Sequence, residues 1–258
     1  MKPLKFSYMQ LTFGQDETYL HPEKTYDRLT RCGYDAIELT PPKGRYGLGV
    51  KMEDYLETHK KLKADYGLDV SCVNECWGEE WDPYSPTYKT LTEPKTADLA
   101  VSETKSTTDF AAELGAPCVT VAVAIHDDIT SDNVAEATAI AVDALRRMSD
   151  YAREKDVRLV FEATNHLEMG KFVNTALNHK RMIDLTGRDN IGIQLDWFHA
   201  NFEELNPYEA VMDAHPLLWH MHFRDSNSLT PGYGTVDFKA VLRAVKRIGY
   251  DGYCTIES

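Results

Sequence analysis

Short apolar runs recur along the chain, and each follows a polar, helix-like segment that ends in glycine. Examples are RCGYDAIEL (31–39), DYGLDVSCV (65–73) and ELGAPCVTV (113–121). Glycine is the usual residue just after the C-terminus of a helix, and a short apolar run is typical of a strand. The pattern therefore predicts a repeated order of helix, glycine and strand. The predicted strands are 4–10, 35–39, 69–74, 117–123, 157–163, 190–196, 217–223 and 252–257.

The segments between these strands have the spacing of amphipathic helices. In 133–155, apolar residues such as Val134, Ile140 and Leu145 recur at helical intervals. Strict alternation of eight strands with helices predicts a (β/α)8 TIM barrel, an α/β fold, as one domain over 1–258. A doubly wound open sheet is the main alternative, but the early strands lack the Gly-rich turn of that fold. The sequence stops just after the eighth strand, so we expect the helix after strand eight to be absent from this chain.

Charge and hydropathy argue against several classes of protein. The formal net charge of −13 repels phosphate backbones, so nucleic acid is not an expected partner. No apolar run approaches the length of a membrane span, and the N-terminus lacks the apolar core of a signal peptide. We therefore expect a cytoplasmic protein with no membrane partner. Cys72 and Cys76 have the spacing of a metal-binding pair, but no second pair completes it, which favours small buried thiols.

Polar residues stand near the C-terminal ends of the last four predicted strands. The apolar side chains of each strand share one face, which we expect to pack against the outer helices, whereas the opposite face points into the barrel. In 217–223, for instance, Trp219 and Met221 share the outer face. The residues that point inward at this end are Glu162, Asp196, His222 and Glu257. Active sites of barrels form at the C-terminal ends of the strands, so we expect these four side chains to meet there.

Three carboxylates that meet in one place beside one imidazole repel one another unless a cation lies between them. A ligand set rich in oxygen, with one nitrogen, favours Mn²⁺, Mg²⁺ or Co²⁺ over structural zinc. The sequence therefore predicts one such ion per chain, with Mn²⁺ as the first choice, and two coordination positions left for substrate oxygens. The alternative is that the four residues are unrelated polar groups, each satisfied by its own hydrogen bonds.

With these residues in view, the sequence resembles the xylose-isomerase-like superfamily of TIM-barrel sugar isomerases and epimerases, nearest the branch of ketose 3-epimerases and inosose dehydratase. The motifs that carry the resemblance are GYDAIEL, FEATNHLE, QLDWFHAN, HMHFRDSN, PGYGTVDF and a terminal IES. The resemblance implies that the four inward residues are the metal ligands, with Glu162 and Glu257 as the catalytic acid/base pair. It implies that Glu168 and His199 bind substrate, and that the chain forms a homo-oligomer, a dimer or tetramer.

Further residues are candidates for substrate binding. Ketose 3-epimerases have an Arg six residues after the ligand His, where this chain has Ser228, and Arg224 is the candidate substitute. Glu38 points inward from the second strand and binds either a substrate hydroxyl or a neighbouring backbone group. His126 follows the fourth strand, either as a base at the rim or as a surface residue. Trp77, in a long aromatic loop, either stacks on the substrate or contributes to a subunit interface.

Two other polar residues have simpler structural interpretations. His220 lies one layer below His222 in the same strand, so we expect it to support the ligands rather than to bind the ion. Asp237 precedes an apolar run of helical spacing in GTVDFKAVL, and an Asp in that place typically caps the N-terminus of the helix that follows. We therefore assign neither residue to catalysis.

Together these features predict a divalent-metal-dependent isomerase or epimerase that acts on a sugar or keto-sugar through an enediolate intermediate. If the substrate has a leaving group beta to its carbonyl, the same intermediate eliminates, so a lyase is the first alternative. A nuclease similar to endonuclease IV is the second, although such enzymes use three zinc ions and an Asp-x-His where this chain has Asp237-Phe238-Lys239. A binding protein without catalysis is the third. No cluster of Lys and Arg stands beside the motifs, which favours an unphosphorylated substrate.

Overall fold

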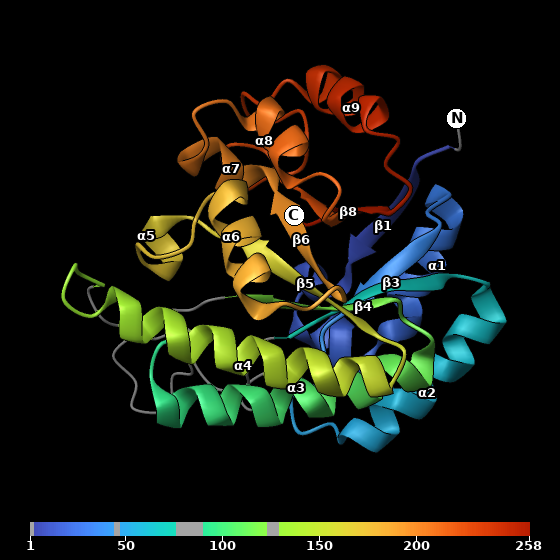
Figure 1. The fold of residues 1–258 in the computed structure, drawn as a ribbon. Coiled ribbons are helices and arrows are strands. Elements are labelled where there is room, and N and C mark those ends of the chain that lie inside the picture. The colour runs from blue at the N-terminus through green and yellow to red at the C-terminus, as the bar shows by residue number, and fades with distance from the viewer. Residues whose placement is uncertain (1–2, 44–46, 76–89, 123–128) are drawn as a thin grey trace.

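The computed structural model describes residues 3–43, 47–75, 90–122 and 129–258. Eight parallel strands pair in chain order and close into a barrel, with helices around its outside (Figure 1). This arrangement confirms the predicted (β/α)8 fold. The strands are β1 Lys5–Met9, β2 Ala36–Leu39, β3 Asp69–Asn74, β4 Cys118–Ala122, β5 Arg158–Ala163, β6 Ile191–Asp196, β7 Leu218–Phe223 and β8 Tyr253–Ile256.

Helices connect successive strands and cover the barrel from outside (Figure 1). Helices lie between successive strands, as the sequence pattern predicts, and the helix predicted at 133–155 is observed as α4. The helices are α1 Pro22–Cys32, α2 Met52–Tyr66, α3 Pro94–Leu114, α4 Val134–Glu154, α5 His166–Met169, α6 Ala176–Thr186, α7 Trp197–Glu203, α8 Pro207–Ala214 and α9 Phe238–Arg247, with two further helical turns, η1 Gln10–Phe13 and η2 Asp16–Leu20. Within the described ranges, none of these helices is long and apolar enough to cross a membrane.

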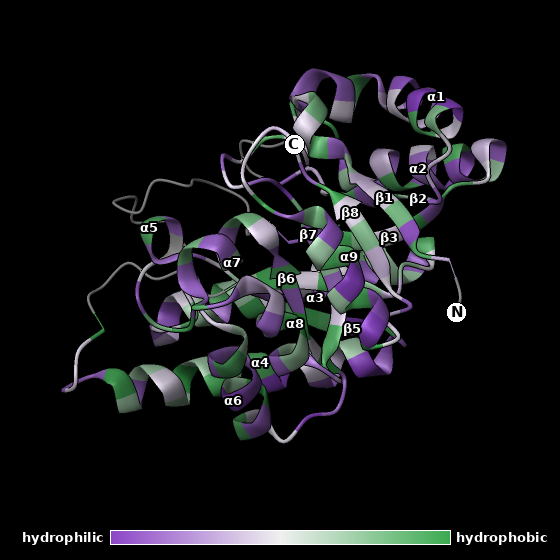
Figure 2. Cartoon of the chain, turned by 90° about the horizontal axis from the view of Figure 1, so that it is seen from above, coloured by the Kyte–Doolittle hydropathy of each residue, from purple (hydrophilic) through white to green (hydrophobic). Residues whose placement is uncertain are grey.

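Apolar side chains on the outer faces of the strands and on the inner faces of the helices form the main core. Ile37, Phe161, Ile193 and Met221 are all 0% exposed, and removal of such side chains from water is the main stabilising contribution. Figure 2 shows hydrophobic residues along the strands and many hydrophilic residues on the surrounding helices. Gly115, which follows α3 in the left-handed conformation that favours glycine, ends that helix as the sequence pattern predicts.

The inside of the barrel, in contrast, is filled by a polar network. The hydroxyl of Thr120 donates to Oε1 of Gln194 at 2.6 Å, and the amide nitrogen of Gln194 lies 3.2 Å from Nδ1 of His222. His220 contacts both Glu38 and Thr255. These side chains are 0–1% exposed, and buried polar groups are stable when each has a partner. The network therefore forms a hydrogen-bonded support for the residues at the C-terminal end of the barrel.

Two strand pairs, β2 with β3 and β6 with β7, depart from regular alternation, and the second changes a predicted face. The register of β6 and β7 shifts between Ile193 and Gln194, and Trp219 is the extra residue on β7. Its side chain packs against Cys72, Cys118 and Val160, a cluster separate from the main core. The prediction that Trp219 shares the outer face with Met221 is therefore wrong, because the irregularity changes the direction of the side chain relative to a regular strand.

Candidate metal centre and active site

The four residues predicted to meet do converge at the C-terminal ends of β5 to β8. One side-chain ligand atom from each of Glu162, Asp196, His222 and Glu257 lies within 4.8 Å of the others. Nδ1 of His222 lies 2.6 Å from Oε2 of Glu257, 3.6 Å from Oε1 of Glu162 and 3.8 Å from Oδ2 of Asp196. The imidazole of His222 thus lies among three carboxylates, and Nδ1 is the ring atom that faces all three.

Asp196 has two oxygens with different roles. Its Oδ1 accepts hydrogen bonds from the backbone amides of Phe198 and His199, at 2.6 and 3.1 Å, and so caps the N-terminus of α7. Its Oδ2 is buried and has no hydrogen-bond partner in the described structure. A buried carboxylate oxygen without a partner is costly. A cation held by this oxygen and the three neighbouring ligands removes that cost, so the donor set fits a divalent ion.

Electrostatics within the cluster separate the two glutamates. Burial raises the pKa of Glu162 to about 7. Burial also acts to raise the pKa of Glu257, but His222 and Arg224 outweigh it and lower that pKa to about 2. For His222, burial alone would lower the pKa, yet the carboxylates of Glu38 and Glu257 hold it well above its ordinary value. The metal-free cluster therefore balances its charges with protons, which a divalent ion would displace.

Glu38 lies beneath this cluster rather than beside the substrate. Its Oε1 accepts a hydrogen bond from Nε2 of His222 at 3.0 Å, and its Oε2 accepts one from Nε2 of His220 at 2.8 Å. The side chain is 0% exposed, and both oxygens are occupied by imidazoles. The predicted contact of Glu38 with a substrate hydroxyl does not fit this geometry, because the carboxylate supports two histidines instead. For His220, the expected supporting contact is observed.

His199, predicted to bind substrate, lies at the edge of the cluster on α7. Its Nδ1 accepts a hydrogen bond from the backbone amide of Asn165 at 3.2 Å and lies 2.6 Å from the side-chain nitrogen of Asn165. Because Nδ1 is an acceptor, Nε2 has the proton and is a donor. The side-chain oxygen of Asn165 caps α5. Sequence reasoning did not identify Asn165, although an Asn at the start of a short polar segment is a typical N-cap.

Arg224 and Glu168 complete the polar rim. Nη1 of Arg224 lies 3.1 Å from Oε1 of Glu257, its Nη2 donates to the hydroxyl of Ser228, and its guanidinium stacks over the ring of Phe198 at 4.6 Å. The nearby Glu168 has a side chain that is 48% exposed. Arg224 therefore brings a cation to the site from the end of β7 and contacts Ser228 directly, at the position where the resemblance predicts an arginine.

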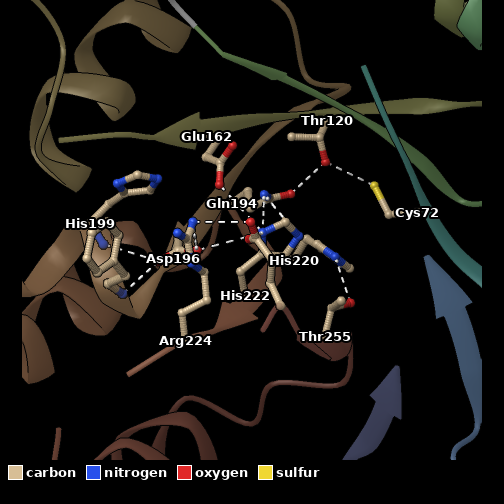
Figure 3. Close-up of polar contacts among 12 residues, drawn as sticks. Cys72, Thr120, Glu162, Gln194, Asp196, His199, His220, His222, Arg224 and Thr255 are labelled. Carbon is tan, nitrogen blue, oxygen red and sulfur yellow. Dashed lines mark hydrogen bonds and ion pairs between the residues drawn. The ribbon is translucent and has the colours of Figure 1, made fainter. Parts of the chain in front are cut away.

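A cavity of about 600 Å³ opens above the cluster. Its lining includes the other three ligand candidates but not Asp196, together with Glu168, His199 and Arg224. Its walls also include residues that sequence reasoning did not identify, namely Met9, Leu11, Thr12, Asn74, Glu75 and Leu167. Lys43 binds the carboxylate of Glu75 at 2.8 Å and holds it in place. Figure 3 shows Glu162, Asp196, His222 and Arg224 gathered together, with His199 to one side. A small polar ligand fits such a cavity.

Two predicted substrate contacts cannot be located. Trp77 and His126 lie outside the described residues, as does most of the aromatic loop that contains Trp77. Asp237, in contrast, is described: its side chain accepts hydrogen bonds from the backbone amides of Lys239 and Ala240 and caps α9. The cap prediction is confirmed, and the position that a three-zinc nuclease would need for a ligand is used by a helix terminus.

Comparison with known proteins identifies relatives of this chain and proteins with the same fold. An L-ribulose 3-epimerase from Methylomonas sp. (strain DH-1) is 27% identical over 261 residues, covering 100% of this chain and 85% of that protein. An inosose dehydratase from Lacticaseibacillus casei is 26% identical over 136 residues, 44% of each chain. A D-allulose 3-epimerase from Methylomonas sp., solved in complex with D-allulose, shares the fold, with a TM-score of 0.81, 23% identity and coverage of 100% of this chain and 85% of that one. The family model described as "Xylose isomerase-like TIM barrel" matches residues 26–258, so the chain belongs to that family.

Proposed function

We propose that this protein is a metal-dependent epimerase or isomerase of a ketose or keto-sugar. The observation that carries the proposal is Oδ2 of Asp196, which has no hydrogen-bond partner in the described structure and lies among two further carboxylates and Nδ1 of His222 at the base of a cavity. The relatives of this chain include sugar epimerases, which supports an enzyme of this class. The ligand set is rich in oxygen and has one nitrogen, so the proposed ion is Mn²⁺, with Mg²⁺ or Co²⁺ as substitutes.

When bound, the ion would polarise the carbonyl and the adjacent hydroxyl of the sugar. Glu162 comes from β5 and Glu257 follows β8, so the two carboxyls approach the cavity from opposite sides of the barrel. One of them takes the proton from the carbon next to the carbonyl, and the other returns a proton to the opposite face of the resulting enediolate. That exchange inverts the configuration of the carbon. The different proton affinities of the two carboxyls support separate acid and base roles.

The rim supplies groups that can orient a sugar. His199 offers an Nε2 donor, Arg224 a cation and Glu168 an exposed carboxylate, and these complement the hydroxyls of a polar substrate. Leu11 and Leu167 give the cavity an apolar side as well. Among the described residues that line the cavity, Arg224 is the only Lys or Arg, and it is already engaged with Glu257. This favours an unphosphorylated substrate over a sugar phosphate.

A lyase is the second candidate, and one observation favours it. Ser228 stands where ketose 3-epimerases have an arginine, and part of the chain is similar to an inosose dehydratase. With a leaving group beta to the carbonyl, the same proton removal by Glu162 or Glu257 leads to elimination rather than to epimerisation. The two candidates share the site and differ only in the substrate and the product.

The test is turnover of a panel of ketohexoses, ketopentoses and keto-glycosides in D₂O, with chelated protein and with protein reloaded with Mn²⁺. Epimerisation predicts Mn²⁺-dependent product with deuterium at the carbon next to the carbonyl. Glu257→Gln and Glu162→Gln should each lower kcat by a factor of at least ~100. A dehydrated or cleaved product would favour the lyase. Full turnover without deuterium at that carbon, and without elimination, would indicate a hydride shift and remove both glutamates from these roles.

We also propose that the protein functions as a homo-oligomer. The proposal comes from the family, and exposed apolar side chains support it: Leu167, Phe202 and Leu205 are 69%, 44% and 108% exposed. Apolar side chains on the surface are candidates for burial between subunits. Light scattering coupled to size-exclusion chromatography measures the mass directly. A mass of one chain at micromolar concentration would exclude a stable dimer or tetramer.

A further inference from the structure

A second group of possible metal ligands lies inside the barrel, below the rim cluster, which is the group of Glu162, Asp196, His222 and Glu257. It consists of Cys72 on β3, Cys118 on β4 and His220 on β7, and one ligand atom from each lies within 4.8 Å of the others. The register that pairs Val73 with Val119 places Cys72 beside Cys118. All three residues are buried, and both cysteines are free thiols. We call these three residues the floor cluster.

The two clusters offer different chemistry. The rim cluster has three carboxylates and one imidazole, whereas the floor cluster has two sulfurs and one imidazole. Thiolates select soft or borderline cations such as Zn²⁺, Cd²⁺ and Cu⁺ over Mn²⁺ or Mg²⁺. Two thiolates also neutralise a divalent cation completely, which matters in a buried place where a net charge is costly. We propose that the floor cluster of Cys72, Cys118 and His220 binds a thiophilic divalent cation, with Zn²⁺ as the expected ion.

The hydrogen bonds of His220 leave one ring nitrogen for the ion. Its Nε2 donates to Oε2 of Glu38 at 2.8 Å, so Nδ1 is the nitrogen with a free lone pair. A carboxylate that accepts a hydrogen bond from the other ring nitrogen of a ligating imidazole is a common arrangement at zinc sites. Figure 3 shows Cys72 and Thr120 beyond His220, on the side away from His199. Glu38 thus supports one histidine of each cluster.

The floor cluster has room beside it for entry of an ion. A cavity of about 430 Å³ lies at the opposite end of the barrel from the active site, and its lining includes Cys118, His220, Trp219 and Arg158. Three protein ligands leave a fourth tetrahedral position, which water from this cavity can fill. The guanidinium of Arg158 stacks over Trp219 at 4.9 Å, and Trp219 packs against both cysteines.

Binding must release protons from the thiols. Burial raises the pKa of the Cys72 thiol well above its ordinary value, so the metal-free thiol is neutral. Each thiol that becomes a thiolate ligand loses one proton to solvent while its sulfur forms a bond to the ion, and no oxidant or reductant takes part. Occupancy of the floor cluster should therefore rise with pH, since proton and metal compete for the same sulfur atoms.

Cobalt(II) provides a test that does not depend on catalysis. The reduced, chelator-stripped protein is titrated anaerobically with Co²⁺, and absorption is recorded in the near ultraviolet, where thiolate-to-cobalt charge transfer occurs. The rim cluster has no sulfur and cannot give this band. We expect the band in the wild type, with saturation near ~2 ions per chain, one in each cluster. Added Zn²⁺ should displace cobalt from the sulfur site and abolish the band.

Variants assign the band to its ligands. Cys72→Ser and Cys118→Ser should each weaken or abolish it and leave about one ion per chain. Cys254→Ser is the matched control, because Cys254 is also a buried cysteine but belongs to the main core, and it should keep the band. His222→Ala should lose the rim ion and keep the band. Absence of the band in the wild type overturns the proposal without any variant. A band that remains in Cys118→Ser but is lost in Cys76→Ser also overturns the proposal.

Discussion

Oε1 of Glu38 lies 3.0 Å from Nε2 of His222, across the ring from Nδ1, which lies 2.6 Å from Oε2 of Glu257. The carboxylate therefore keeps the proton of the neutral imidazole on Nε2 and leaves the lone pair of Nδ1 for the ligand cluster. Such contacts orient a ligand and increase its basicity. Glu38 and His222 are far apart in the sequence, and the closed barrel brings them together.

Glu38→Gln tests this relationship. The substitution removes the charge that supports His222 but not the shape of the side chain, so we expect the Kd for Mn²⁺ to rise by ~10- to 100-fold. Calorimetric titration of the chelated protein measures the change. Glu168→Gln is the matched control, because it neutralises a carboxylate of the active-site cavity whose side chain is 48% exposed and lies outside the ligand cluster. Equal affinity of the two variants would contradict the role assigned to Glu38.

The number of protons released when the metal binds should depend on pH. Before the ion binds, Glu162 has a pKa raised by burial to about 7, and the pKa of His222 is also raised, so both hold protons below pH 7. The ion favours their deprotonated forms. As pH rises through about 7, Glu162 is already ionised before binding, so the number of protons released should fall by about one. The affinity should therefore rise more steeply with pH below about 7 than above it, where the proton of His222 remains to be displaced.

Calorimetry in buffers of different ionisation enthalpy counts these protons at pH 6 and pH 8. In Glu162→Gln the decrease between the two pH values should disappear, although the ion binds more weakly. In Glu257→Gln the decrease should remain, because His222 and Arg224 hold the pKa of Glu257 near 2 against the effect of burial, so it is ionised throughout. If the decrease disappears in Glu257→Gln and remains in Glu162→Gln, the displaced proton belongs to Glu257, and the assignment to Glu162 is wrong.

Much of this architecture follows from the sequence pattern. The strand count and the convergence of Glu162, Asp196, His222 and Glu257 follow from two local rules, the alternation of side chains along a strand and the common end at which barrel strands deliver their last residues. Asp196 also shows why a core strand can end in an Asp. One oxygen caps the helix that begins at once, and the other faces the ligands.

Contacts between side chains inside the barrel could not be predicted from the alternation of residues along each strand. The bond between Glu38 and His222, and the proximity of Cys72 to Cys118, depend on which residues of neighbouring and distant strands lie at the same height. Register fixes that height, and the hydrophobic pattern does not determine it when both faces of a strand are buried. Trp219 illustrates the same limit, because one irregular step between β6 and β7 reverses the face that alternation predicts.

Gly192→Ala tests the packing at that irregular step. A Cβ on Gly192 would lie 2.3 Å from ring atoms of Trp219 and 2.7 Å from the carbonyl oxygen of Leu217. Because backbone as well as side chain must move, we expect a loss of ~1–3 kcal/mol in the free energy of unfolding. Urea unfolding of the metal-free protein measures it. In the double variant with Trp219→Ala the added cost of the alanine should fall, and an unchanged cost would show that Trp219 is not the residue in conflict.

Asn165 should affect catalysis through His199. Its side-chain oxygen caps α5, while its side-chain nitrogen lies 2.6 Å from Nδ1 of His199 and helps to keep the proton on Nε2. Asn165→Asp preserves a good cap but replaces the donor by an acceptor, which draws the proton to Nδ1 and removes the Nε2 donor from the cavity.

For the proposed epimerisation we expect Asn165→Asp to lower kcat/KM by ~10-fold or more, since one hydrogen bond to the reacting substrate is lost. Mn²⁺ content and the free energy of unfolding should stay near the wild-type values. Asn206→Asp is the matched control, because Asn206 caps α8 in the same way, and it should leave kcat/KM unchanged. If both variants lose activity together, or if Asn165→Asp loses the ion, His199 is not positioned through its Nδ1 by Asn165.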